Sequence, residues 1–184
     1  PFASLAMPTV GTCDYNNKQY NNGTHTVVPN ASGVTVFCDG LELKPQSDVT
    51  FPAGIYVIKG NKFEIQAQSV ARGEGVVFVF SGAEAYLKMN GGGSAILKAP
   101  VTSATGATAP YAGFLFVDDR NNKPKVATDI RGGGDVKMEG IVYQPSRALI
   151  IGGNGQVNQN SKYFAMVADS YYLNGTGDLY LKTD

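Results

Sequence analysis

Short apolar runs separated by turn residues set the pattern of this chain, and they are densest between positions 49 and 100. Five runs of three to five residues occur there, at 49–51, 55–58, 63–65, 76–80 and 95–99. They are rich in Val, Ile, Phe and Tyr, which are typical of β-strands, and none is long enough for an ordinary helix. Glycine, proline, serine or asparagine stands between each run and the next, as tight corners require. The segment therefore predicts a series of short strands joined by turns.

The same pattern continues to the end of the chain. A loop of small residues at 100–110 (PVTSATGATAP) precedes a strongly apolar strand at 111–117, and residues 118–125 form an exposed polar excursion. Further short strands are expected at 135–138, 140–143, 149–151, 163–168, 171–173 and 178–181. Residues 1–23 show little periodicity, and 14–23 (DYNNKQYNNG) predict a loop, so the first strand is expected at 24–28.

Many short strands at short intervals favour a solenoid over an immunoglobulin-like sandwich, whose strands are longer and more widely spaced. We predict a right-handed parallel β-helix in which each coil holds two or three strands and stacks on the next at about 4.8 Å. With roughly 20–25 residues per coil, the chain makes about seven coils. The prediction is one domain over residues 1–184, with 1–23 as a poorly periodic N-terminal segment. A jelly roll is the alternative.

Composition narrows the classes of function. The chain has 184 residues, of which 43% are apolar, enough for one domain with a buried core. Charged residues make up 16%, and fifteen basic residues balance fifteen acidic ones. Without a basic stripe, the chain is not expected to bind nucleic acid or to be held electrostatically on a membrane surface. No apolar run reaches the 18 or so residues of a transmembrane helix.

Cys13 and Cys38 are the only cysteines, and no CxxC motif or second pair suggests zinc. We expect a disulfide that constrains the unfolded chain by roughly 3 kcal/mol and places the protein outside the cytoplasm, in the periplasm, on the cell surface or secreted. The alternative is two buried, reduced thiols.

Several stretches, in order along the chain, resemble the C-terminal β-helical region of TadE/TadG-like proteins of bacterial tight-adherence (Tad, Flp pilus) loci. They are the two cysteines with CDGL at 38–41, VTFPAGIYVIKG at 49–60, GEGV at 73–76 with FVFSG at 78–82, YAGFLF and DDR at 111–116 and 118–120, GIVYQPS at 140–146, and MVAD at 166–169. The resemblance implies an envelope-exposed or extracellular part of a pilus or secretion apparatus, with a role in surface attachment and no known chemistry. Unlike many members, this chain has no cysteine after Cys38.

The sharpest polar cluster is Asp118, Asp119 and Arg120, followed by Asn121. Paired carboxylates can hydrolyse glycosidic bonds, and β-helices also include pectin-degrading enzymes. However, the histidine and the Arg-x-Lys motif that accompany the acids in that class are absent, since His25 is the only histidine and is far away in the sequence. A polar corner with an Asp–Arg pair is the favoured interpretation, and a calcium site that uses both acids and Asn121 is the third.

Tyrosine is the one residue type with evident binding potential, because ten are present and exposed ones can stack on sugars or contact a partner. The alternative is that most of them line strand edges. Three function hypotheses follow: a non-enzymatic, extracytoplasmic module of a Tad-type apparatus that serves assembly or attachment, a polysaccharide hydrolase or lyase, and a glycan-binding adhesin. The first is preferred. It implies other pilus or envelope proteins as partners, surface glycans as a further partner, a full-length form anchored in the membrane upstream of Pro1, no cofactor, no metal and no catalytic residue.

Overall fold

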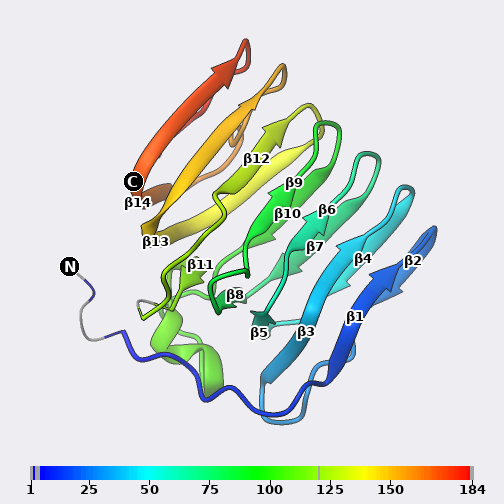
Figure 1. Cartoon of the computed structure of the whole chain (residues 1–184), viewed down its shortest axis with the longest axis vertical. Helices are drawn as coiled ribbons and strands as arrows, with labels where there is room; N and C mark the ends of the chain where they lie inside the picture. Colours follow the sequence, from blue (N-terminus) through cyan, green and yellow to red (C-terminus); the bar gives the residue numbers. More distant parts are fainter. Residues whose placement is uncertain (1, 3–4, 120, 183–184) are drawn as a thin grey trace.

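The computed structural model describes residues 2, 5–119 and 121–182, and it is a parallel β-solenoid of about seven turns. This confirms the predicted all-β class and coil number, and only 3% of the residues are helical. Figure 1 shows the coils stacked from the N-terminal to the C-terminal end. The strands are β1 (Tyr15–Tyr20), β2 (Gly23–Thr26), β3 (Val34–Leu43), β4 (Ser47–Phe51), β5 (Gly54–Lys59), β6 (Phe63–Ile65), β7 (Val70–Glu74), β8 (Val76–Ser81), β9 (Leu87–Met89), β10 (Ser94–Lys98), β11 (Phe114–Asp118), β12 (Thr128–Gly132), β13 (Val136–Gly153) and β14 (Phe164–Gly175), with one 3₁₀ helix, η1 (Gly106–Tyr111).

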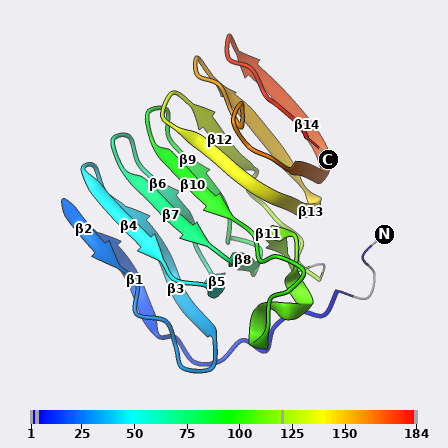
Figure 2. The ribbon, with the colours of Figure 1, turned by 180° about the vertical axis from the view of Figure 1, so that it is seen from behind.

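Each full coil has three sides, and strands on the same side pair in parallel with those of the next coil (Figures 1 and 2). The first face contains the start of β3, then β5, β8, β11, and parts of β13 and β14. The second face contains β1, the end of β3, β6, β9, β12 and the later parts of β13 and β14. The third face contains β2, β4, β7, β10 and the start of β13.

Alternation of apolar and polar residues places one row of side chains inside the stack and the next outside. On the third face, Val49 pairs with Ala71, Ala71 with Ala95, and Ala95 with Val136, and all four are buried. Burial of apolar surface stabilises a fold by roughly 25 cal/mol per Å². Because the members of this ladder are covered by residues of the adjacent coils, each coil is stabilised by its neighbours more than by its own contacts.

The first face is buried on both sides, which explains why its strands are continuous apolar runs rather than alternating ones. The inner row joins the main core. The outer row of β3, β5, β8 and β11 forms a second hydrophobic cluster with Tyr111, and Leu5, Met7 and Val10 of the N-terminal segment pack against it. The Tyr111 hydroxyl donates a hydrogen bond to the Ala6 carbonyl at 2.5 Å. The poorly periodic N-terminal segment is therefore a cover for this face.

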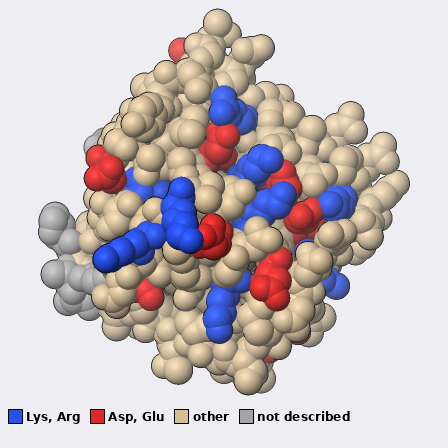
Figure 3. Space-filling view, viewed as in Figure 1, with Lys and Arg blue, Asp and Glu red and all other residues tan. Residues whose placement is uncertain are grey.

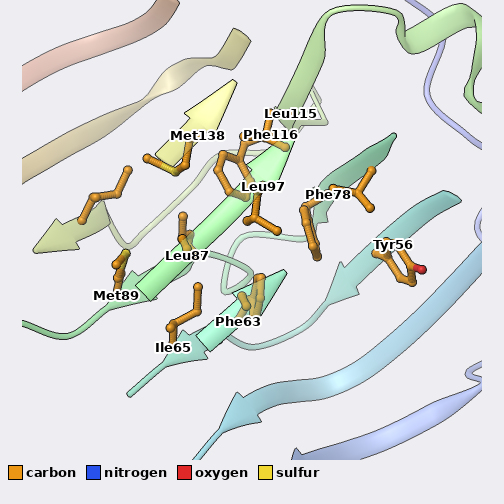
Figure 4. Packing of buried hydrophobic residues seen from close by; sticks show 14 of the residues in the cluster. Tyr56, Phe63, Ile65, Phe78, Leu87, Met89, Leu97, Leu115, Phe116 and Met138 are labelled. Atoms are coloured by element: carbon orange, nitrogen blue, oxygen red, sulfur yellow. The ribbon is translucent and has the colours of Figure 1, made fainter. Parts of the chain in front are cut away.

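Aromatic rings form a ladder inside the stack (Figure 4). The ring centroid of Phe78 lies 5.5 Å from that of Tyr56, 5.0 Å from that of Phe63 and 5.6 Å from that of Phe116. Pairs at such distances contribute about 0.5–1.5 kcal/mol beyond their burial. The Tyr56 hydroxyl donates to the Pro52 carbonyl at 2.6 Å, so the one polar atom of this ladder is paired.

Glycines line the corner between the second and third faces in the later coils, where successive backbones pass in contact. Gly153 and Gly175 both have positive φ, 99° and 100°. A Cβ on Gly153 would lie 2.4 Å from the Gly132 carbonyl oxygen, and one on Gly175 would lie 2.4 Å from that of Gly153. Only glycine fits these positions, as expected of β-corners.

The stack begins earlier than the sequence predicted. The loop expected at 14–23 is wrong, because β1 occupies Tyr15–Tyr20 and pairs with β3. The register shifts between Asn16 and Lys18, and Asn17 has a φ of 42°. This bulge breaks the alternation that would reveal a strand in the sequence. Among the described residues, no helix is long and apolar enough to cross a membrane.

Candidate functional site

Asp118 is not part of an exposed excursion, and this prediction is wrong. It is the last residue of β11, and it is 1% exposed. Its Oδ2 accepts a hydrogen bond from Arg147 Nε at 2.7 Å, and its Oδ1 accepts one from Gln144 Nε2 at 2.8 Å. Burial raises the pKa of the Asp118 carboxyl, and the Arg147 charge opposes that shift. Both oxygens are therefore engaged in a buried network.

Arg147 is the centre of this network, although the sequence did not single it out. Its side chain is buried, and it also donates to the Ala85 carbonyl at 2.6 Å and to the Val126 carbonyl. These bonds connect β13 to the segments before β9 and β12. The sequence does contain a signal for it, a lone arginine between two apolar strands. An arginine buried between such strands needs an acidic partner.

Of the other members of the predicted polar cluster, Asp119 and Asn121 are bonded to each other. Asp119 Oδ1 accepts a hydrogen bond from the Asn121 backbone at 2.9 Å, and Asn121 is exposed. Arg120 lies outside the described residues. The predicted pairing of an aspartate with Arg120 therefore also lies outside the described residues, and the charge partner of Asp118 is Arg147. Both Asp118 oxygens already accept a hydrogen bond, and the described part of the chain contains no group of three His, Cys, Asp or Glu side chains placed to hold a metal ion.

The predicted disulfide is present. Cys13 and Cys38 are bonded, with their Cα atoms 5.7 Å apart. Asp14 stands next to Cys13, and its carboxylate accepts hydrogen bonds from the Val36 backbone at 2.8 Å and from the Asn30 side chain at 2.6 Å. The bridge and the aspartate together attach the N-terminal segment to the first coils.

Within the described residues, apolar side chains of β14 are exposed at the C-terminal end of the stack, which we call the open end. Tyr171 and Leu173 occupy the positions that Leu149 and Ile151 hold one coil earlier. Leu149 and Ile151 are 0% and 4% exposed, whereas Tyr171 and Leu173 are 46% and 68% exposed. β14 pairs with β13 on one side, and at its start the Phe164 backbone exchanges hydrogen bonds with that of Lys182, at 2.7 and 3.0 Å, on the other side; Figures 1 and 2 show β14 as the last strand of the stack. The end of the stack therefore presents an apolar surface beside a strand edge.

The N-terminal end is built differently. The Lys18 ammonium lies 5.4 Å from the centre of the Tyr15 ring and 4.8 Å from that of the Tyr20 ring. The His25 ring is 5.3 Å from the Tyr20 ring. A cation over two aromatic rings both covers them and gives that end a charge. This end thus resembles the polar cap that terminal coils of solenoids usually have.

Ion pairs follow the outside of the second face. Glu64 is 4% exposed, and its oxygens contact the ammonium groups of Lys62 at 2.5 Å and Lys88 at 3.2 Å and the amide of Asn90 at 3.1 Å. Burial raises the pKa of Glu64, but hydrogen bonds from these three residues outweigh it and lower the pKa to about 2. Figure 3 shows side chains of both signs interspersed on this side of the molecule. The charges neutralise one another, as in a structural network.

A groove of about 590 Å³ lies on the outside of the third face, between β4, β7, β10 and the start of β13. We call it the third-face groove. Charged and apolar side chains line it: four basic (Arg72, Lys98, Lys137, Lys162), two acidic (Glu74, Glu139) and an apolar set that includes Phe51, Pro52, Ile96 and Leu97. The sequence did not reveal it, because its cations are spread over 90 positions and come together only through coil stacking.

The tyrosines divide into buried and exposed ones. Tyr20, Tyr56, Tyr111 and Tyr143 are buried, so they serve packing. Tyr171 and Tyr172 are exposed, and both lie on β14 at the open end. No protein-family model, no curated protein and no solved structure matches this chain.

Proposed function

We propose that this chain is a non-enzymatic structural or adhesive module that works outside the cytoplasm, as part of a Tad-type pilus or secretion apparatus, in assembly or surface attachment. The observation that carries the proposal is the open end of the stack at β14. Solenoids need polar caps to remain soluble as separate units. An end with exposed Leu173 and Tyr172 beside a strand edge favours addition of a strand from another pilus or envelope protein.

The disulfide supports the proposed location. Disulfides persist in oxidising compartments, which include the periplasm and the cell surface, and are rare in the cytosol. The Cys13–Cys38 bridge holds the segment that covers the first face, so it stabilises the outer layer of the solenoid.

The buried network weakens the enzyme alternative, in which Asp118 and Asp119 would hydrolyse or eliminate a polysaccharide. A catalytic carboxylate has to contact its substrate, and Asp118 is covered and bonded through both oxygens. An activity screen on acidic glycans, with Asp119→Asn beside the wild type, tests this alternative. Depolymerisation that is lost in the variant would establish the enzyme and refute the module.

The proposal itself is tested by crosslinking in the bacterium that encodes the chain. A photoreactive amino acid replaces Leu173 at the open end, and in a matched strain it replaces Val28, which is 73% exposed and lies outside β14. We expect crosslinks to pilus or envelope proteins from position 173 and not from 28. A deletion strain that assembles pili and attaches normally, together with no crosslink from 173, would refute the proposal.

A further inference from the structure

We propose that the third-face groove binds a linear polysaccharide that carries carboxylate groups, such as a polyuronate. This inference names a ligand for the attachment role proposed above and rests on it to that extent. It depends on the groove alone and makes no use of the open end of the stack.

The groove concentrates positive charge in a chain whose net charge is zero. Four cations and two acids line it, and with Asp48, the partner of Arg72, the excess is one positive charge. Arg72 is paired with Asp48 at 2.9 Å and Lys98 with Glu74 at 2.9 Å. By contrast, within the described part of the chain no acidic side chain lies within 4 Å of the Lys137 or Lys162 ammonium group. On the second face, each lysine near Glu64 has an acidic partner within 4 Å.

The cations follow the stacking direction. Ile96 stands between Arg72 and Lys137 in one row, and Lys98 stands between Glu74 and Glu139 in the neighbouring row. The Lys162 backbone contacts Glu139 at 3.4 Å, which places Lys162 one coil further on. The positive groups therefore extend over three coil steps, roughly 14 Å at the usual strand spacing. Arg72 and Lys98 already have acidic partners, so the unpaired charge lies on Lys137 and Lys162, one coil step apart, and a polymer that follows the groove passes both.

The apolar floor of the groove favours a glycan over other polyanions as the ligand. Ile96 and Pro52 are half-buried, and Phe51 and Leu97 lie beneath them with almost no exposure. This floor offers aliphatic surface for the C–H faces of pyranose rings. Single-stranded nucleic acids instead need exposed aromatic platforms on which their bases stack, and no exposed ring lines the groove.

The test uses hexagalacturonate as the probe and its fully methyl-esterified form as the control, because the two share a backbone and differ in charge. Isothermal titration calorimetry should show that the acid form binds and that added NaCl weakens binding, since salt screens exposed charges. Lys137→Gln and Lys162→Gln should each weaken it about tenfold, the usual effect of losing one charge-assisted hydrogen bond. Lys59→Gln, which neutralises an exposed lysine on β5 outside the groove, should leave it unchanged.

Four results would overturn the inference: no binding of the acid form at millimolar concentration, equal affinity for the esterified form, equal losses in Lys59→Gln and Lys137→Gln, or tighter binding of an acidic peptide such as hexaglutamate. Failure here is distinguishable from failure of the proposed function. Crosslinking at position 173 reports on assembly, and none of the groove variants alters the C-terminal end.

Discussion

Arg147 offers the sharpest test of how the buried network works. Replacing it with methionine keeps most of its volume but removes its bonds to Asp118, Ala85 and Val126. The Asp118 carboxylate then stays buried without a charge partner, and two carbonyl groups lose their donor. Breaking a buried ion pair from one side costs about 3–5 kcal/mol. For a domain whose total stability is about 5–15 kcal/mol, Arg147→Met should remove a large share of it.

Urea unfolding followed by circular dichroism measures this loss directly. Asp118→Leu combined with Arg147→Met should cost less than the sum of the two single changes, because the double variant leaves no unpaired charge. Arg72→Met is the matched control. Its ion pair with Asp48 is 2.9 Å long but its side chain is 44% exposed, so its removal should cost less than about 1 kcal/mol. Equal losses for Arg147→Met and Arg72→Met would refute the assignment of a stabilising role to the network.

Three further predictions concern other parts of the fold. Changing Cys13 and Cys38 together to serine should lower the free energy of unfolding by roughly 3 kcal/mol, and a reducing agent should do the same to the wild type; a loss only in the variant would contradict this. Gly153→Ala should lower the midpoint of thermal unfolding markedly, because its Cβ would meet a carbonyl oxygen at 2.4 Å, whereas Gly11→Ala, with open space around it, should have little effect. Glu64 has a folded pKa of about 2 against an ordinary 4.5, so its contribution of about 3 kcal/mol should be complete above pH 4.5 and lost as the pH falls towards 2. The unfolding free energy of Glu64→Gln should depend less on pH in that window, and an unchanged slope would disprove the prediction.

The coil architecture was predictable because every coil repeats the same pattern of short apolar strands and turn residues. Ile55 pairs with Val77, and Val49 pairs with Ala71, both 22 positions further on, within the expected 20–25 residues per coil. Corners rich in glycine and asparagine supplied the rest of the signal. Strand β1 was missed because a bulge interrupts its alternation, and a bulge has no reliable marker in one sequence.

Partners across coils were harder to predict than the coils themselves. Asp118 pairs with Arg147, because stacking brings positions 29 residues apart together at the end of a strand. The same holds for the groove, whose four cations come from four successive coils. The prediction that Asp118 belongs to an exposed cluster with its neighbours in the chain was therefore wrong, although the hydrophobic pattern located the strand that ends at Asp118.

Among the described residues, the third-face groove and the C-terminal end of the stack carry the unpaired lysines and exposed apolar side chains on which the proposals rest, and the two are adjacent. The N-terminal segment covers the first face, and paired charges follow the second face around Glu64. The third-face groove and the open C-terminal end remain, and Lys162, at the last coil of the groove, stands two residues before β14 begins. A partner strand that adds to β14 would therefore lengthen the stack in the direction in which the groove runs. Assembly and ligand binding would then reinforce each other through added contact length, since each further coil can supply another contact to the same extended polymer.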